Sequence, residues 1–168
     1  MFLYVFKGEV ILLRTHILRL LTVMIFEGRA YAIVTGEHSY STALSRASQM
    51  RYRGLAGHLT TITSEREYNF LYWTMNARDV WIALSDASSD GVWKHTAGPD
   101  SGKPALSSNF TLWAFGQPNG GTRESCAFVD AGGYADDTCS YRSYGYIIEF
   151  ECLDTSSPQG RCNRMSLC

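Results

Sequence analysis

The sequence predicts a mixed α+β domain with one long loop region. Two segments in the first half of the chain carry apolar residues at helical spacing, and short segments rich in β-forming residues lie before and after them. About sixty residues between the last two predicted strands show little periodicity. Because structureless segments of that length are uncommon in compact domains, we expect this region to carry the function.

Length and composition indicate a single domain. The chain has 168 residues, of which 45% are apolar and 13% aromatic, enough for the core of one domain but not of two. Its formal net charge is -1, and the lysines and arginines are scattered along the sequence. Since nucleic-acid-binding domains concentrate basic residues in a patch, no nucleic-acid partner is expected.

The first predicted elements are a strand and a helix. Residues 29–34 are rich in β-formers and are bounded by Gly28 and Gly36, as expected of a short strand. Residues 40–53 have helical spacing and stop at Gly54, which predicts the end of the helix there. The apolar positions with this spacing are Ala43, Leu44, Ala47 and Met50.

A capping box predicts the second helix, and two strands follow it. In Ser64-Glu65-Arg66-Glu67, we expect the Ser64 hydroxyl to accept hydrogen bonds from first-turn amides while the Glu67 carboxylate reaches back to the cap. Residues 80–84 are continuously apolar, which favours a strand covered on both faces. Residues 146–151 alternate, which favours a half-buried strand.

The first 25 residues have three interpretations. The segment is apolar but interrupted by charges, and its longest uncharged run, residues 20–26, is seven residues long. Such a run is too short to span a bilayer and is a poor signal-peptide core. In order of preference, the segment is a degenerate leader, a basic amphipathic segment lying on a membrane, or an extra helix packed on the domain.

The five cysteines all lie at or beyond Cys126, and their spacing does not suggest a structural zinc site. Cys126 and Cys139 enclose a loop rich in Gly and Asp, where a disulfide would add roughly 3 kcal/mol of stability. The alternative is a pair of buried free thiols. The disulfide is the preferred interpretation and indicates an oxidising compartment. The tripeptide Asn109-Phe110-Thr111 fits the N-glycosylation pattern and supports the same location.

Several motifs, taken together and in order, resemble the C-type lectin-like domain. They are GHLTTITSEREYNFL, WIALSD, DGVW, LWAFGQPN, ESC, YADDTC and YGYIIEFE. The resemblance covers residues 26–151, and it implies a fold in which the first and last strands pair and two helices flank small antiparallel sheets. It also implies a long loop region that binds a calcium ion, which in turn binds sugar. Residues 1–25 and 152–168 are then an N-terminal segment and a cysteine-containing tail.

The resemblance assigns the calcium and sugar ligands residue by residue. The family's loop motif of an acid or amide, a cis proline and a second amide or acid matches Gln117, Pro118 and Asn119. The acid two positions before the next cysteine is Glu124, and Asp136 matches the acid three positions before Cys139. Ca²⁺ prefers such oxygen ligands, and groups that bind the metal can also hydrogen-bond sugar hydroxyls.

Two departures weaken this site. Ala135 stands where the family has an amide, and Gln117 is neutral. Glu124 and Asp136 are therefore the certain carboxylates, with Asp137 as a third if it turns inward, and we expect a calcium Kd of about 10⁻⁴ to 10⁻³ M. The alternative is that these are ordinary polar turn residues. Gln117-Pro118-Asn119 matches neither the mannose-type nor the galactose-type motif, so the sugar type is undecided.

Asp86 and Asp90 are weak candidates for the family's auxiliary calcium position. The other two acids of that position are replaced by Gly120 and Ser125, so capping and turn formation are the preferred roles for both aspartates. Three tryptophans fall on the family's core positions and are expected in the core rather than against a sugar; they are Trp81, Trp93 and Trp113.

The usual disulfide between the first helix and the last strand is missing. Ala47 and Ile148 lie near its two positions, and we expect apolar packing there instead. The tail carries an odd number of cysteines, which favours a disulfide-linked oligomer; they are Cys152, Cys162 and Cys168.

The functional prediction is calcium-dependent carbohydrate binding by a secreted or surface-exposed domain. The alternative is a calcium-independent module of the same fold that binds a protein. Catalysis is not expected, because the sequence contains no nucleophile motif and no phosphate-binding glycine loop.

Overall fold

The computed structural model describes residues 4–11, 19–105, 110, 112–142 and 144–151, with side chains from residue 21 onward. Asn109, Thr111 and the three tail cysteines lie outside the described residues, so the predictions made for them stay predictions. The strands are β1 Tyr4–Ile11, β2 Arg19–Phe26, β3 Arg29–His38, β4 Arg51–Tyr52, β5 Leu55–Leu59, β6 Val80–Ser85, β7 Lys94–His95, β8 Cys126–Asp130, β9 Gly133–Asp137 and β10 Tyr144–Phe150. The helices are α1 Tyr40–Gln49 and α2 Glu65–Asn69, the latter continued by a π-helical turn over Phe70–Thr74.

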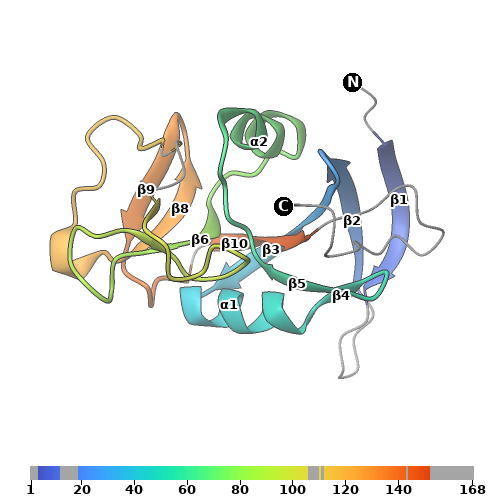
Figure 1. Ribbon diagram of the computed structural model, residues 1–168, viewed down its shortest axis with the longest axis horizontal. Helices are drawn as coiled ribbons and strands as arrows, with labels where there is room; N and C mark the ends of the chain where they lie inside the picture. The colour runs from blue at the N-terminus through green and yellow to red at the C-terminus, as the bar shows by residue number, and fades with distance from the viewer. Residues whose placement is uncertain (1–3, 12–18, 106–109, 111, 143, 152–168) are drawn as a thin grey trace.

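A central sheet organises the molecule, with one helix on each face (Figure 1). Its described strands follow the order β1-β2-β3-β10-β6-β8-β9, with β5 also paired to β10. The first and last strands of the predicted domain, β3 and β10, pair antiparallel with Ile33 opposite Ile147. This confirms the pairing that the resemblance implied.

Strand β10 separates two apolar cores. Ile148 and Phe150 face the cluster that contains Ala47 of α1, whereas Ile147 faces the cluster that contains Leu71 after α2. The prediction of a half-buried strand is therefore wrong: helices cover both faces of β10, and even Glu149 is fully buried. Strand β6 was predicted as covered on both faces, and all its residues are buried.

The first helix ends earlier than predicted. It stops at Gln49 rather than near Arg53, because residues 51–59 fold back as a hairpin of β4 and β5. The two turn residues Arg53 and Gly54 have φ of 49° and 83°, the left-handed conformation that two-residue hairpins require. Gly54 thus marks a hairpin turn and not a helix end.

The second helix begins as the capping box predicts, with one change of partner. The Ser64 hydroxyl accepts a hydrogen bond from the Glu67 amide at 3.2 Å. The Glu67 carboxylate accepts from the Thr63 amide at 2.9 Å, and from the Tyr31 hydroxyl at 2.7 Å. Glu67 therefore ties the start of α2 to β3 as well as to its own cap.

The N-terminal segment forms strands. Strand β2 pairs with β3, and Val23 is fully buried in the core beside α1. The extra-helix interpretation is wrong for the described residues, because the β-branched and apolar residues of β2 extend the sheet past β3. The domain boundaries at residues 26 and 152 stay predictions.

The long loop region contains three strands that the periodicity did not reveal, β7, β8 and β9. A disulfide between Cys126 and Cys139 connects the start of β8 to the segment after β9, as predicted. Trp81 and Trp93 are buried in the core, and Trp113 is half-buried against Trp93.

Close packing replaces the missing disulfide between α1 and β10. Ala47 and Ile148 are fully buried in one cluster. Between them lies Gly57 of β5, where a Cβ atom would come within 2.9 Å of the Ala47 carbonyl oxygen, the Ile148 Cγ2 and the Phe150 ring.

We therefore expect Gly57→Ala to lower the free energy of unfolding by about 1–3 kcal/mol, the usual cost of overpacking a core. Urea denaturation followed by circular dichroism measures this change. Ala56→Ser on the same strand is the matched control, because Ala56 is exposed and its new oxygen meets solvent. Equal stability of the Gly57 variant and the unmodified protein would contradict the packing described.

Candidate functional site

The predicted site residues lie at one end of the sheet, where the loop of residues 116–124 folds over β9. The peptide bond between Gln117 and Pro118 is cis, as the resemblance implied. Residues 121–123 form a short 3₁₀ turn that leads into Glu124 and then β8. Strands β8 and β9 pair in register, with Ala127 opposite Asp136.

Asp136 holds the loop in place. Its carboxylate is buried, and it accepts hydrogen bonds from the backbone amides of Asn119 at 3.0 Å and Gly120 at 2.9 Å. Each carboxylate oxygen takes one amide and keeps a further lone pair. Residues 119 and 136 are thereby brought together through the backbone of Asn119.

The side chain of Gln117, two residues before Asn119 in the same loop, carries an oxygen atom without a described partner. Its side-chain Oε1 is buried and accepts no hydrogen bond from the described residues. An unsatisfied buried oxygen costs about 1–3 kcal/mol unless a cation or a donor meets it. A cation or a hydrogen-bond donor at this oxygen would remove that cost.

Glu124 lies beside the other acids. Desolvation, followed by the negative charges of Asp136 and Asp137, raises the pKa of Glu124 above its usual 4.5. The side chain folds back over Gly120, where an added Cβ would come within 2.2 Å of the Glu124 Cβ. Glu124 thus fills the space that a side chain at position 120 would need, and the acid that the family has there would not fit beside it.

Asp137 and Ala135 offer fewer free oxygen atoms to the candidate calcium site than Glu124 and Asp136 do. The Asp137 carboxylate accepts hydrogen bonds from the Thr138 amide through Oδ1 and from the Tyr144 hydroxyl through Oδ2, so each of its oxygens already has a donor. Ala135 is buried in the core that contains Phe128, its partner across the β8–β9 pair. These positions leave Glu124 and Asp136 as the carboxylates of the loop.

The auxiliary candidates do not join this group through any described hydrogen bond. Asp86 is buried and accepts a hydrogen bond from the Gly91 amide at 2.8 Å, which closes the turn after β6. Its second oxygen has no hydrogen-bond partner among the described residues. Asp90 lies exposed in that turn.

The donor set suits Ca²⁺ bound weakly. Two carboxylates and the amide oxygens of Gln117 and Asn119 are hard ligands of the kind that calcium takes, and the unpartnered Gln117 Oε1 fits a cation. The three acids 124, 136 and 137 are not packed tightly, because their oxygens do not all come within 4.8 Å of one another. The residues fit calcium, with few charges to hold it.

Sequence reasoning missed two features. Phe115, two residues before Gln117, has a fully exposed ring. In addition, His58, Glu149 and Glu151 bring their ligand atoms within 4.8 Å of one another, the closest such group of His, Cys, Asp or Glu among the described residues. Nothing in the local sequence reveals this cluster, because it depends on the pairing of β5 with β10.

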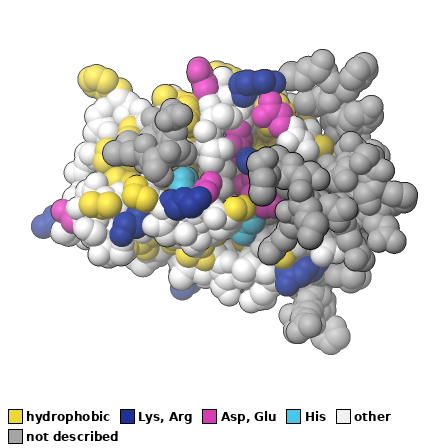
Figure 2. Space-filling view, in the orientation of Figure 1, with side chains coloured by type: hydrophobic (Ala, Val, Ile, Leu, Met, Phe, Trp, Pro, Cys, Tyr) yellow, Lys and Arg dark blue, Asp and Glu magenta, His cyan; other side chains and the backbone are white. Residues whose placement is uncertain are grey.

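Basic side chains are dispersed among acidic ones on the face shown in Figure 2. Among the described residues, the helices are too short and too polar for any of them to cross a bilayer.

Comparison with protein families gives a match to the lectin C-type domain over residues 46–147. Halomucin from Haloquadratum walsbyi is 31% identical over 139 residues, which are 79% of this chain and 2% of that protein. Human C-type lectin domain family 17, member A is 28% identical over 128 residues, which are 76% of this chain and 31% of the relative. The chain thus corresponds to a third or less of these relatives' length.

Solved structures share the fold. The mouse scavenger receptor C-type lectin carbohydrate-recognition domain aligns with a TM-score of 0.62 and 22% identity, covering 76% of this chain and 91% of that one. The carbohydrate-recognition domain of cow CD23, solved with a GlcNAc2Man3 oligosaccharide, aligns with a TM-score of 0.61 and 23% identity. The alignment again covers 76% of this chain and 91% of that one. Herring type II antifreeze protein aligns with a TM-score of 0.59 and 18% identity, covering 76% of this chain and 94% of that one.

Removing the Asp136 carboxylate tests its hold on the loop. In Asp136→Ala the amides of Asn119 and Gly120 lose their acceptor, and we expect their hydrogen exchange to accelerate by about tenfold or more, corresponding to about 1–3 kcal/mol. NMR-detected exchange of the calcium-free protein measures this. The matched control is Asp137→Ala, which leaves both amides protected, and equal acceleration in the two variants would contradict the assignment.

Proposed function

The chain belongs to the C-type lectin domain family, and we propose that it binds carbohydrate through a calcium ion held by the loop of residues 117–124 and Asp136. One observation carries the proposal: the buried, unpaired Oε1 of Gln117 lies in a loop that the Asp136 carboxylate anchors. The cis bond before Pro118 matches the family's motif at the same place.

We assign the ligand roles to this chain's own residues. Gln117, Asn119, Glu124 and Asp136 would hold the ion through oxygen atoms, with Asp137 too far turned toward Tyr144 to contribute fully. Bound calcium would offer its remaining coordination positions to two neighbouring hydroxyls of a sugar. The amide nitrogens of Gln117 and Asn119 can donate to those hydroxyls, while Glu124 can accept from them.

The ligand class is a glycan of undecided type. Among the similar proteins, the cow CD23 domain was solved with an oligosaccharide, which supports carbohydrate as the ligand class here. Gln117 and Asn119 both carry amides, so the loop presents donors and acceptors on both sides of Pro118 and does not select one hydroxyl arrangement over the other.

The proposed setting is outside the cell. Family members are in general binding modules and not enzymes, and we propose the same of this chain. The disulfide between Cys126 and Cys139 supports an oxidising compartment. Pairing between chains through the tail cysteines would join several weak sites and raise avidity.

A second candidate function is calcium-independent binding of a protein. Two observations favour it: Ala135 supplies no ligand oxygen, and the exposed ring of Phe115 lies beside the loop. The fold is also found in an antifreeze protein, so it does not require a sugar ligand.

Thermal melting in calcium separates the two functions. With a Kd of about 10⁻⁴ to 10⁻³ M, 10 mM Ca²⁺ would stabilise the folded protein by about 1.4–2.7 kcal/mol. We expect Tm to rise by roughly 3–10 °C and to return to its starting value in chelator. In Glu124→Gln the rise should shrink to less than half, whereas the matched control Glu65→Gln, at an exposed helix position, should keep it.

The sugar itself is tested on immobilised mannose-type and galactose-type glycans, with and without chelator. Retention that chelator abolishes supports the lectin function. A Tm that does not change with calcium, together with no retention on either immobilised glycan, would contradict the lectin function and favour the protein-binding module.

Calcium affinity should depend on pH through Glu124. Calcium needs the ionised carboxylate, and the raised pKa means that Glu124 takes up a proton at a higher pH than an ordinary glutamate at 4.5. The calcium Kd should therefore rise as pH falls from 7.5 through the raised pKa. Without calcium the sign reverses, because the folded state binds this proton more tightly than the unfolded state and gains stability over the same window.

Calorimetric titration of calcium at several pH values, together with calcium-free urea melts, measures both effects. Glu124→Gln should flatten both curves. A calcium Kd that stays constant down to pH 4.5 would refute the role given to Glu124.

A further inference from the structure

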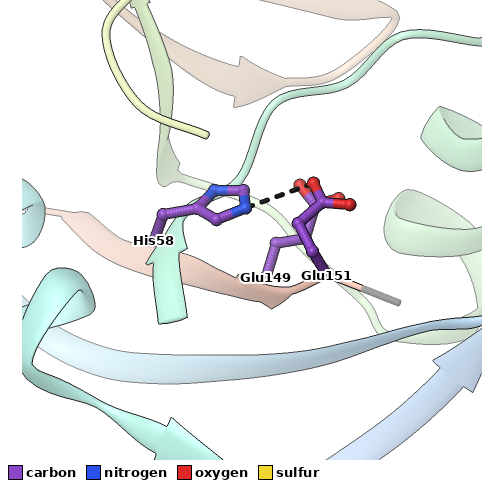
Figure 3. Close-up of side chains that lie close together, drawn as sticks. All are labelled: His58, Glu149 and Glu151. Carbon is purple, nitrogen blue, oxygen red and sulfur yellow. Dashed lines mark hydrogen bonds and ion pairs between the residues drawn. The ribbon is translucent and has the colours of Figure 1, made fainter. Parts of the chain in front are cut away.

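A second group of ligand-type side chains lies at the junction of β5 and β10, away from the loop of residues 117–124. His58 and Glu149 are direct partners in the antiparallel register of these strands. Glu151 follows two residues after Glu149, so its side chain projects to the same face. Figure 3 shows the imidazole and the two carboxylates pointing toward one another, and their ligand atoms lie within 4.8 Å.

The hydrogen bonds of His58 fix the state of its ring. Nδ1 lies 2.9 Å from the Leu59 carbonyl oxygen, which can only accept, so Nδ1 carries a hydrogen. Nε2 then faces the Glu151 Oε1 at 3.3 Å. In a neutral ring this would set a lone pair against a carboxylate oxygen. A hydrogen or a metal cation between the two atoms would remove this repulsion.

Glu149 directs its Oε1 toward His58 and Glu151, and this oxygen accepts no hydrogen bond from the described residues. Its side chain is fully buried, and Oε2 accepts a hydrogen bond from the Thr61 amide at 3.1 Å. Oε1 accepts none from the described residues, and its cationic neighbour, the Arg29 Nε, is 3.5 Å away. A buried carboxylate oxygen without a donor is costly, and a bound cation would remove that cost.

The surroundings are short of positive charge. Arg29 lies within ion-pair distance of Glu67, Glu149 and Glu151, at 3.3, 3.5 and 3.6 Å.

We propose that His58, Glu149 and Glu151 bind one divalent zinc ion, independently of the calcium loop. An imidazole nitrogen with two carboxylates is a donor set that suits zinc, whereas calcium and magnesium take oxygen ligands alone. Tetrahedral zinc with bonds of about 2.0–2.2 Å places neighbouring ligand atoms about 3.3–3.6 Å apart. The Nε2–Oε1 separation of 3.3 Å between His58 and Glu151 meets that spacing.

The site has the further features of a built metal centre. The Nδ1 hydrogen bond to Leu59 orients the imidazole, as a backbone carbonyl does for many metal-bound histidines. Glu151 is 28% exposed, so the cluster reaches the solvent. Arg29, whose side chain is 35% exposed, is the competing cation. A bound ion would join β5 to β10.

Zinc titration of the full chain tests the proposal. The tail thiols are first alkylated without reductant, so that they take no metal and the Cys126–Cys139 disulfide stays intact. We expect one zinc per chain, a rise in Tm, and no displacement by millimolar calcium. His58→Gln and Glu151→Gln should each weaken zinc binding by about tenfold or more, and Glu65→Gln, the same change at an exposed glutamate, should not.

A second measurement avoids the variants. This measurement uses NMR spectra of the alkylated protein without substitutions. The ring signals of His58, alone among the four histidines, should shift when zinc is added. Zinc that leaves His58 unchanged, binding that survives both substitutions, or displacement by calcium would overturn the site. An absence of zinc binding would assign the Nε2 position to a proton and overturn it as well, without bearing on the calcium loop.

Discussion

Strand β10 is the constraint on which the rest of the molecule depends. It pairs with β3 on one side and with β5 and β6 on the other, so its backbone is hydrogen-bonded along both edges. Its side chains serve two cores, one beneath each helix. Any polar residue in such a strand has no solvent face, and Glu149 is held by Arg29 and Thr61 for that reason. The two helices pack against its opposite faces. Its pairing with β5 also brings His58 beside Glu149.

Much of the fold could be predicted because local signals agreed with it. The Ser64 cap and the continuous apolar run of β6 both identified their elements. The failures have a common cause, which is that tertiary pairing decided what the local pattern left open. Gly54 fits either a helix end or a hairpin turn, and only the pairing of β4 with β5 selects the turn. Similarly, the alternation in β10 is compatible with one covered face until both helices are in place.

In the candidate site, too, the sequence implied some contacts, whereas others depend on side-chain direction and strand pairing. The motif order implied that Asn119 and Asp136 meet, and in the structure they do so through the Asn119 backbone amide and the Asp136 carboxylate. Their role as metal ligands stays a prediction. The sequence did not show that Asp137 turns toward Tyr144, or that Glu124 takes the space above Gly120, since both depend on side-chain direction. The partners of His58 lie more than ninety residues away along the chain and meet it only across the sheet.

The two ends of the sheet differ in how they are closed. Beside β9, residues 112–114 bond to Tyr134 and shield that margin. On the opposite side β3 is covered by β2, and β2 by β1, so among the described strands the outermost row of backbone donors and acceptors belongs to Tyr4–Ile11. Intermolecular strand addition, whether productive or leading to aggregation, would therefore begin at β1 and leave the loop of residues 117–124, at the other end of the sheet, untouched.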